Sequence, residues 1–140
     1  MIDNINFKIG DYYELLALHK ALLEAKFHQE PNNIEVCFSP IVAKLSNEIV
    51  DALTNFNIEK KKLWEDWRKL ENHSDFRNIA LMNACSYSYW LKLNYCGKVD
   101  ACKALLSPFL TTQNDIELFI EEVEQKMEEK NEKYYIFSCP

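Results

Sequence analysis

The stretch DFRNIALMNACSYSYWLKLNY, residues 75–95, decides the fold class that the sequence indicates. Its apolar residues cover nearly all sides of a helical wheel, and a helix of that kind usually lies in the middle of a fold. Small residues such as Ala80 and Ala84 would let neighbouring helices approach closely, and Gly97 is a natural C-terminal stop. We therefore predict a buried central helix over residues 75–95, with other helices packed around it.

Three amphipathic helices are expected before this stretch, each marked by apolar residues at three- and four-residue spacing. The first covers about residues 12–27 and is capped by Asp11. The second covers about residues 40–56 and begins at Ser39, because serine caps a helix and the proline after it suits the first turn. The third covers about residues 58–71. The second helix is expected to bury Ile41, Val42, Leu45, Ile49, Leu53 and Phe56.

Two more helices are expected after the central one. A short helix over about residues 99–107 is stopped by Pro108. The last runs from Thr112 to about residue 131, because Thr112 and Asp115 resemble a capping box. Its inward side is expected to carry Ile116, Phe119, Ile120, Val123 and Met127.

Three short runs, residues 5–9, 34–38 and 134–138, lack the helical pattern, and together they could form a minor sheet. No repeat, linker or low-complexity segment divides the 140 residues. The predicted fold is therefore mainly α: one domain over residues 1–140, a bundle of about five to six helices with a buried central helix and an optional short β element.

Glycine is scarce, and this scarcity excludes several classes of enzyme. The chain has two glycines, whereas a phosphate-binding loop, a dinucleotide fingerprint and a nucleophile elbow each need more than one at fixed spacing. The paired Glu-x-x-His motifs of a di-iron bundle are also absent. We therefore predict a protein that is not an enzyme and that holds no cofactor.

The five cysteines are expected to be free thiols in a cytoplasmic protein. Their number is odd, residues 1–10 show no signal-peptide pattern, and no apolar run reaches the roughly 18 residues that a membrane helix needs. Cys96 and Cys102 flank a short turn in this interpretation and could pair if oxidised. No metal site is predicted, because the Cys-x2-Cys spacing of structural zinc sites is absent.

Two groups that suggest function also have a structural explanation. Lys60, Lys61 and Lys62 near Trp64 and Trp67 look like a nucleic-acid helix, but both tryptophans share the inward face and the net charge is −6. We predict a solvated helix and no direct contact with nucleic acid. His19 lies on the apolar side of the first helix, so it is interpreted as a core histidine rather than an acid or base.

An aromatic cluster near the end of the predicted central helix leaves two interpretations open. Tyrosine and tryptophan are common both in cores and at binding hot spots. Core packing is the preferred interpretation, and a pocket shared with His19 would instead favour a small-ligand carrier or an enzyme. The cluster comprises Tyr87, Tyr89, Trp90 and Tyr95.

The last helix carries an ordered acidic stripe. Residues 115–140 hold eight acids and three lysines, so they supply −5 of the net charge of −6. Like charges at four-residue spacing cost about 0.2–0.5 kcal/mol of helix stability per pair, so the stripe destabilises the helix slightly. Solubility explains such a surface, and a docking site for a basic protein also explains it. The stripe consists of Glu117, Glu121, Glu124 and Glu128.

In size, charge and this acidic stripe, the chain resembles the immunity proteins that bacteria make against their own toxins. The resemblance implies a cytoplasmic inhibitor that covers a basic toxin or nuclease, with the stripe as the partner-binding site and no covalent step. The alternative is a helical regulatory or adaptor protein, of phage or viral origin among others, and after it a small-ligand-binding domain or enzyme. The sequence leaves the oligomeric state open.

Overall fold

The computed structural model describes residues 5–138, and the side chains of residues 5–130. The described chain forms helices and no strand, which confirms the mainly α prediction. No described helix is both long and apolar enough to span a bilayer. The helices are α1 Tyr12–Lys26, α2 Ile34–Phe38, α3 Pro40–Thr54, α4 Ile58–Trp67, α5 Ser74–Ser86, α6 Tyr95–Leu106 and α7 Gln113–Ser138, with 3-10 turns η1 Leu70–Asn72 and η2 Trp90–Lys92.

Capping side chains set the starts of α1 and α3 where the sequence predicts them. The Asp11 carboxylate accepts a hydrogen bond from the backbone N–H of Glu14 at 2.8 Å, which begins α1. The Ser39 hydroxyl accepts from the N–H of Val42 at 3.2 Å, and Pro40 occupies the first position of α3.

The capping box of α7 is also present. The Thr112 N–H donates to the Asp115 carboxylate at 2.9 Å, and the Asp115 N–H donates to the Thr112 hydroxyl at 3.1 Å. Four of the five residues predicted to face inward are buried and Met127 is half-buried.

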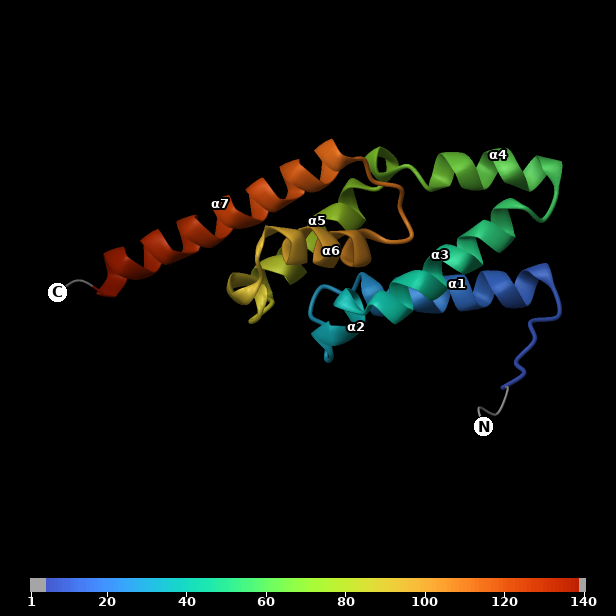
Figure 1. Cartoon of the computed structure of the whole chain (residues 1–140), viewed down its shortest axis with the longest axis horizontal. Coiled ribbons are helices and arrows are strands. Elements are labelled where there is room, and N and C mark those ends of the chain that lie inside the picture. The colour runs from blue at the N-terminus through green and yellow to red at the C-terminus, as the bar shows by residue number, and fades with distance from the viewer. Residues whose placement is uncertain (1–4, 139–140) are drawn as a thin grey trace.

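The helices form two packed groups (Figure 1). In one, α1 and α4 flank α3 around a core of Ile49, Val50, Leu53 and Trp64. In the other, α7 lies across α5 and α6 over a larger core that includes Phe119. The short α2 contacts helices of both groups, and Trp67 packs against both cores, so the two groups share one continuous apolar interior.

The predicted central helix is shorter than expected. Residues 75–95 do not form one helix: α5 ends at Ser86, and Trp90 is buried from the separate turn η2. The chain leaves the helix at Tyr87, whose backbone is extended and whose ring stacks on Phe38 of α2 with centroids 4.1 Å apart. Tertiary packing thus overrides the local helical pattern. One face of α5 reaches solvent, where Met82 is 57% exposed.

Gly97 begins a helix instead of ending one. It lies in the first turn of α6, where its N–H donates to the side chain of Asn94 at 2.7 Å. A Cβ at this position would approach Asn94 Oδ1 and Leu93 within 3.3 Å. Glycine therefore serves close packing at a helix start, and the predicted helix over residues 99–107 starts four residues early.

The predicted minor sheet is wrong. Residues 5–9 form no regular element, residues 34–38 form α2, and residues 134–138 continue α7. The Asn33 side chain caps α2 by accepting from the N–H of Glu35 at 3.1 Å, which explains how so short a run becomes helical.

The face that α3 buries differs in part from the prediction. Ile49 and Leu53 are buried, but Ile41 is 72% exposed and Leu45 is 45% exposed. The core lies on the side of α3 that faces α1 and α4, so the apolar residues at its start point outward. Phe56, past the end of the helix, is also exposed, as is Leu63 on α4.

Two cations tie the helices together: Lys26 is buried, and the side chain of Arg68 is 13% exposed. Lys26, at the end of α1, is 1% exposed and donates from Nζ to the carbonyl of Ala104 on α6 at 2.5 Å. Arg68, after α4, donates to the carbonyl of Pro108 at 2.7 Å and to Asn47 on α3 at 3.0 Å. The Ala104 carbonyl lies in the last turn of α6, where helix geometry leaves carbonyls unpaired, and the Pro108 carbonyl lies in the loop that follows α6.

Candidate functional site: a groove between α6 and α7

The four glutamates of the acidic stripe line one groove. Its cavity of about 510 Å³ lies beside α7, and Tyr95, the first residue of α6, forms part of its wall. Ile120 is the buried residue at its floor. The structure thus brings together every predicted partner-binding residue, and the wall combines carboxylates with aromatic and aliphatic surface: Glu117, Glu121, Glu124, Glu128, Tyr95, Ile120 and Gln125.

The carboxylates of the groove differ in how they are paired. Glu124 forms an ion pair with Lys98 on α6 at 2.7 Å, and this lysine also lies over the ring of Trp90 at 5.5 Å. Glu117 accepts a hydrogen bond from Gln113 at 3.0 Å. Glu121 is exposed and pairs with no cation among the described residues. Glu124 therefore anchors α6 to α7, while the other carboxylates remain open to solvent.

Apart from Lys98, the cations near α7 that the structure pairs with acidic or thiol groups lie on its other flank. Glu122 forms a bidentate pair with Arg77 on α5 at 2.9 and 3.1 Å, and this arginine holds the pKa of the Glu122 carboxyl below its usual value. Burial raises the pKa of the Cys85 thiol, which also lies on α5, and the charges of Lys126 and Lys130 oppose this rise. The α5 side of α7 is therefore internally compensated, whereas the α6 side presents a surplus of negative charge.

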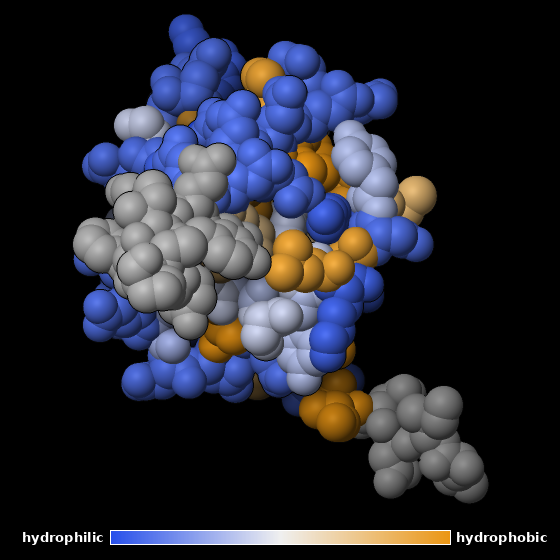
Figure 2. All heavy atoms as spheres, turned by 90° about the vertical axis from the view of Figure 1, so that its left-hand side faces the viewer, coloured by the Kyte–Doolittle hydropathy of each residue, from blue (hydrophilic) through white to orange (hydrophobic). Residues whose placement is uncertain are grey.

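The groove continues toward the start of α7. A second cavity of about 270 Å³ shares Tyr95 and Glu117 with the first, and Val99 and Ile116 add apolar wall. Figure 2 views the molecule from the end at which α7 terminates and shows a mainly hydrophilic surface with small apolar islands. The two adjoining cavities therefore combine apolar wall with charged residues along α7.

Sequence reasoning missed the role of Lys98. Residue 98 falls before the predicted helix over residues 99–107, so nothing in the pattern placed its side chain against α7. The Asn94 cap, which accepts from the N–H of Gly97, is the local signal that would have moved the helix start and aligned Lys98 with the stripe.

The aromatic cluster divides between core and surface. Trp90 is buried, Tyr87 is half-buried against Phe38, and Tyr89 is 52% exposed. Tyr95 is 56% exposed in the groove, so it alone of the cluster joins the candidate site. The preferred core interpretation therefore holds for Trp90 and fails for Tyr95.

His19 is a core residue, as predicted. Its ring makes edge contacts with Trp64 and Trp67, with centroids 5.1 and 4.8 Å apart. Burial, with a smaller contribution from Lys20, lowers the pKa of His19 to about 4. His19 thus packs against residues of α4, whereas Tyr87 packs on Phe38 of α2.

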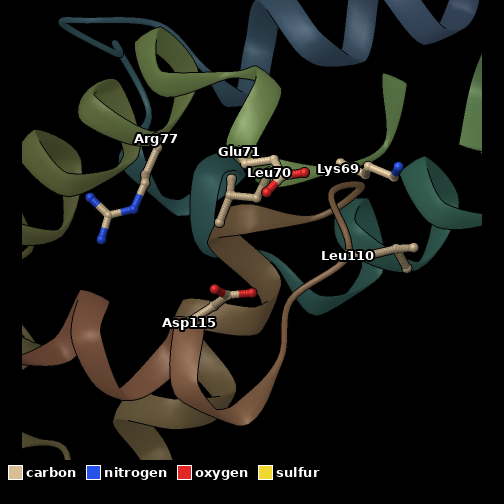
Figure 3. Close-up of a pocket in the computed structure, with 6 residues that line it drawn as sticks. All are labelled: Lys69, Leu70, Glu71, Arg77, Leu110 and Asp115. Atoms are coloured by element: carbon tan, nitrogen blue, oxygen red, sulfur yellow. The ribbon is translucent and has the colours of Figure 1, made fainter. Parts of the chain in front are cut away.

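A charged hollow between η1, α5 and α7 is a weaker candidate. Its volume is about 310 Å³, and Figure 3 shows Arg77 on one side, turned away from Lys69 and Leu110 on the other, with Asp115 on the first turn of α7. Three of its four charged residues are already engaged: Arg77 pairs with Glu122, Lys69 pairs with Asp66 at 3.3 Å, and Asp115 caps α7.

The cysteines offer no paired site within the described chain. Cys96 and Cys102 are six residues apart on α6, which separates them by about 9 Å along the axis, beyond the reach of a disulfide. Cys37, Cys85, Cys96 and Cys102 are free, and Cys139 lies outside the described residues. No group of three or more His, Cys, Asp or Glu among the described residues is placed to hold a metal ion.

Compared with known proteins, the chain matches no family model, no curated protein and no solved structure.

Proposed function

We propose that the chain is a protein-binding inhibitor that neutralises a basic toxin or nuclease by covering it with the groove between α6 and α7. One observation carries the proposal: all four stripe glutamates line the same groove, together with the exposed ring of Tyr95. A solubility surface needs exposed charge but has no need of a shared cavity with an aromatic wall.

The wall of the groove suits a long basic side chain. Lysine and arginine carry an aliphatic stem below a cationic head, and the stem packs on apolar surface while the head stays polar. The stem would lie on Ile120 and the Tyr95 ring, and the head would meet Glu121 or Glu128. Inhibition would be steric and electrostatic, with no covalent step, and the negative charge would speed the encounter.

The test is capture of the partner from the native host, followed by an assay of the partner's toxic or nuclease activity with and without the chain. The variant Glu117→Lys/Glu121→Lys replaces two exposed groove carboxylates and leaves the Glu124–Lys98 pair intact. We expect it to fold and to bind more weakly, with a loss that shrinks at high salt if the pairs stay exposed.

A matched control is Glu59→Lys/Glu65→Lys, which makes the same change in net charge on the exposed side of α4. It should bind and inhibit like the parent protein. If both variants weakened binding equally, net charge alone would explain the effect, and this result would contradict a specific role for the groove. A captured partner that is not basic would instead favour the regulatory or adaptor alternative.

A further inference from the structure

The smaller of the two cavities beside α7 differs in character from the groove that holds the glutamates. This cavity, the slot, has a volume of about 270 Å³ and lies between α6 and the first turns of α7. Val99 and Ile116 form its apolar wall, and Ile116 is 2% exposed. Of the four glutamates of the stripe, the slot includes only Glu117. The slot therefore offers apolar surface where the groove offers negative charge.

Three polar side chains of the slot are already engaged within the chain. Glu117 accepts a hydrogen bond from Gln113 at 3.0 Å. The Thr112 hydroxyl accepts one from the backbone of Asp115 at 3.1 Å, in the capping box of α7. Lys103 is exposed and also lines a hollow between α3 and α6, which places it at the rim. An aliphatic side chain fits such a slot best, because a polar group would give up hydrogen bonds to water for few replacements.

The groove next to the slot favours a different occupant. Glu121 is exposed there and pairs with no cation among the described residues, whereas Glu124 is held by Lys98. An open carboxylate beside the apolar surface of Ile120 suits a cation on an aliphatic stem. The two adjoining cavities thus have complementary preferences, one for an aliphatic group and one for a lysine or arginine.

Tyr95 joins the two cavities, and its 56% exposed ring lines both of them. On α6, Val99 of the slot follows Tyr95 by four residues. On α7, Ile116 of the slot precedes Ile120 of the groove by four residues. Four residues advance a helix by about 6 Å, so the cavities are offset by about this distance. Residues i and i+2 of an extended segment place their side chains on one side at a similar spacing of roughly 6.6 Å.

We propose that the site recognises a partner segment in which an aliphatic side chain and a lysine or arginine lie two residues apart. The aliphatic group fills the slot, the cation enters the groove, and the Tyr95 ring packs between them. This inference rests on the proposed function, which supplies a basic partner, and adds a determinant of specificity to it. Negative charge alone would admit any basic surface, whereas the slot selects one that carries an apolar residue beside the cation.

NMR titration of the isotope-labelled full chain with short capped peptides tests the proposal. The probes are the tripeptides Leu-Ala-Lys and Lys-Ala-Leu, each compared with the peptide in which alanine replaces leucine. At least one leucine peptide should bind about fivefold or more tightly than its alanine counterpart, because the slot buries the leucine side chain. Its binding should shift the amide signals of Val99 and Glu121 together.

Variants of the chain separate the slot from the groove. Val99→Phe fills the slot without changing charge, so it should abolish the preference for leucine and leave binding of the alanine peptides unchanged. Tyr95→Ala, at an exposed position, removes the wall that both cavities share and should weaken both kinds of peptide. The matched control is Ile58→Phe, because Ile58 is 91% exposed on α4 and lines neither cavity. It should bind like the parent, and circular dichroism checks that every variant folds.

The outcomes distinguish the slot from the proposed function. Equal binding of leucine and alanine peptides by the parent would overturn the slot and leave the preference of the groove for cations in place. A folded Val99→Phe variant that keeps the leucine preference, or peptides that shift no signal at either cavity at high millimolar concentration, would also overturn the inference. Failure of the proposed function is a separate result, the capture of a partner that is not basic.

Discussion

The buried amine of Lys26 predicts a specific dependence of stability on pH. Burial lowers the pKa of Lys26 to about 8 from the usual 10.5, because its surroundings supply a carbonyl acceptor and no carboxylate hydrogen bond. The unfolded chain therefore holds this proton more tightly than the folded protein. The free energy of unfolding should rise between pH 8 and pH 10.5 and lose that gain on return to neutral pH.

The magnitude follows from the two pKa values of Lys26, whose difference corresponds to about 3 kcal/mol. Lys26→Met removes this contribution, because methionine fills similar space and does not titrate. It also leaves the Ala104 carbonyl without its donor, at a cost of about 1–3 kcal/mol. At neutral pH the two effects nearly cancel, so the variant should be as stable as the parent or slightly more stable.

Urea unfolding at a series of pH values between 7 and 10.5, with a reductant present, measures the effect. The difference between parent and Lys26→Met isolates Lys26 from the tyrosines and thiols that titrate nearby. Lys20→Met is the matched control, because Lys20 is exposed on the same helix. If the parent and Lys26→Met follow parallel curves over this range, the buried amine does not titrate as described.

Four further predictions concern stability and reactivity. Ala84 is completely buried, so Ala84→Glu should lower the free energy of unfolding by about 3 kcal/mol or more; an unchanged melting temperature would place this face in solvent. Arg68→Ala removes the side chain that joins α3 to the loop before α7, and urea unfolding should show a loss of about 2 kcal/mol. In the native protein Cys96 should react first with a thiol reagent, whereas Cys102, buried and with a pKa raised to about 12, should react only after unfolding. Under denaturing conditions without reductant, about five thiols are expected, and a count of one would contradict the expectation of reduced cysteines.

Capping residues in the sequence correctly predicted those helix starts that depend only on residues nearby in the chain. Ser39 with Pro40, and Thr112 with Asp115, define helix starts within a few residues of chain, and both starts are confirmed. The acidic stripe on α7 could also be predicted from the sequence, because helical periodicity alone places its glutamates on one side.

What the sequence could not predict depends on contacts between distant segments. The end of α5 at Ser86 follows from the stacking of Tyr87 on Phe38, a residue 49 positions away, and no local pattern contains that contact. The exposure of Ile41 and Leu45 depends on which side of α3 receives α1 and α4. Periodicity reveals an apolar side but not how much of it the rest of the chain covers.

The positions of the three tryptophans allow intrinsic fluorescence to follow the unfolding of each group of helices. Trp64 belongs to the core of α1, α3 and α4, Trp90 belongs to the core of α5, α6 and α7, and Trp67 touches both. Single-tryptophan variants would therefore separate the emission of each half from that of the junction. If the halves melt together, all three signals change at one temperature; if one half opens first, the signal from Trp67 changes in two steps.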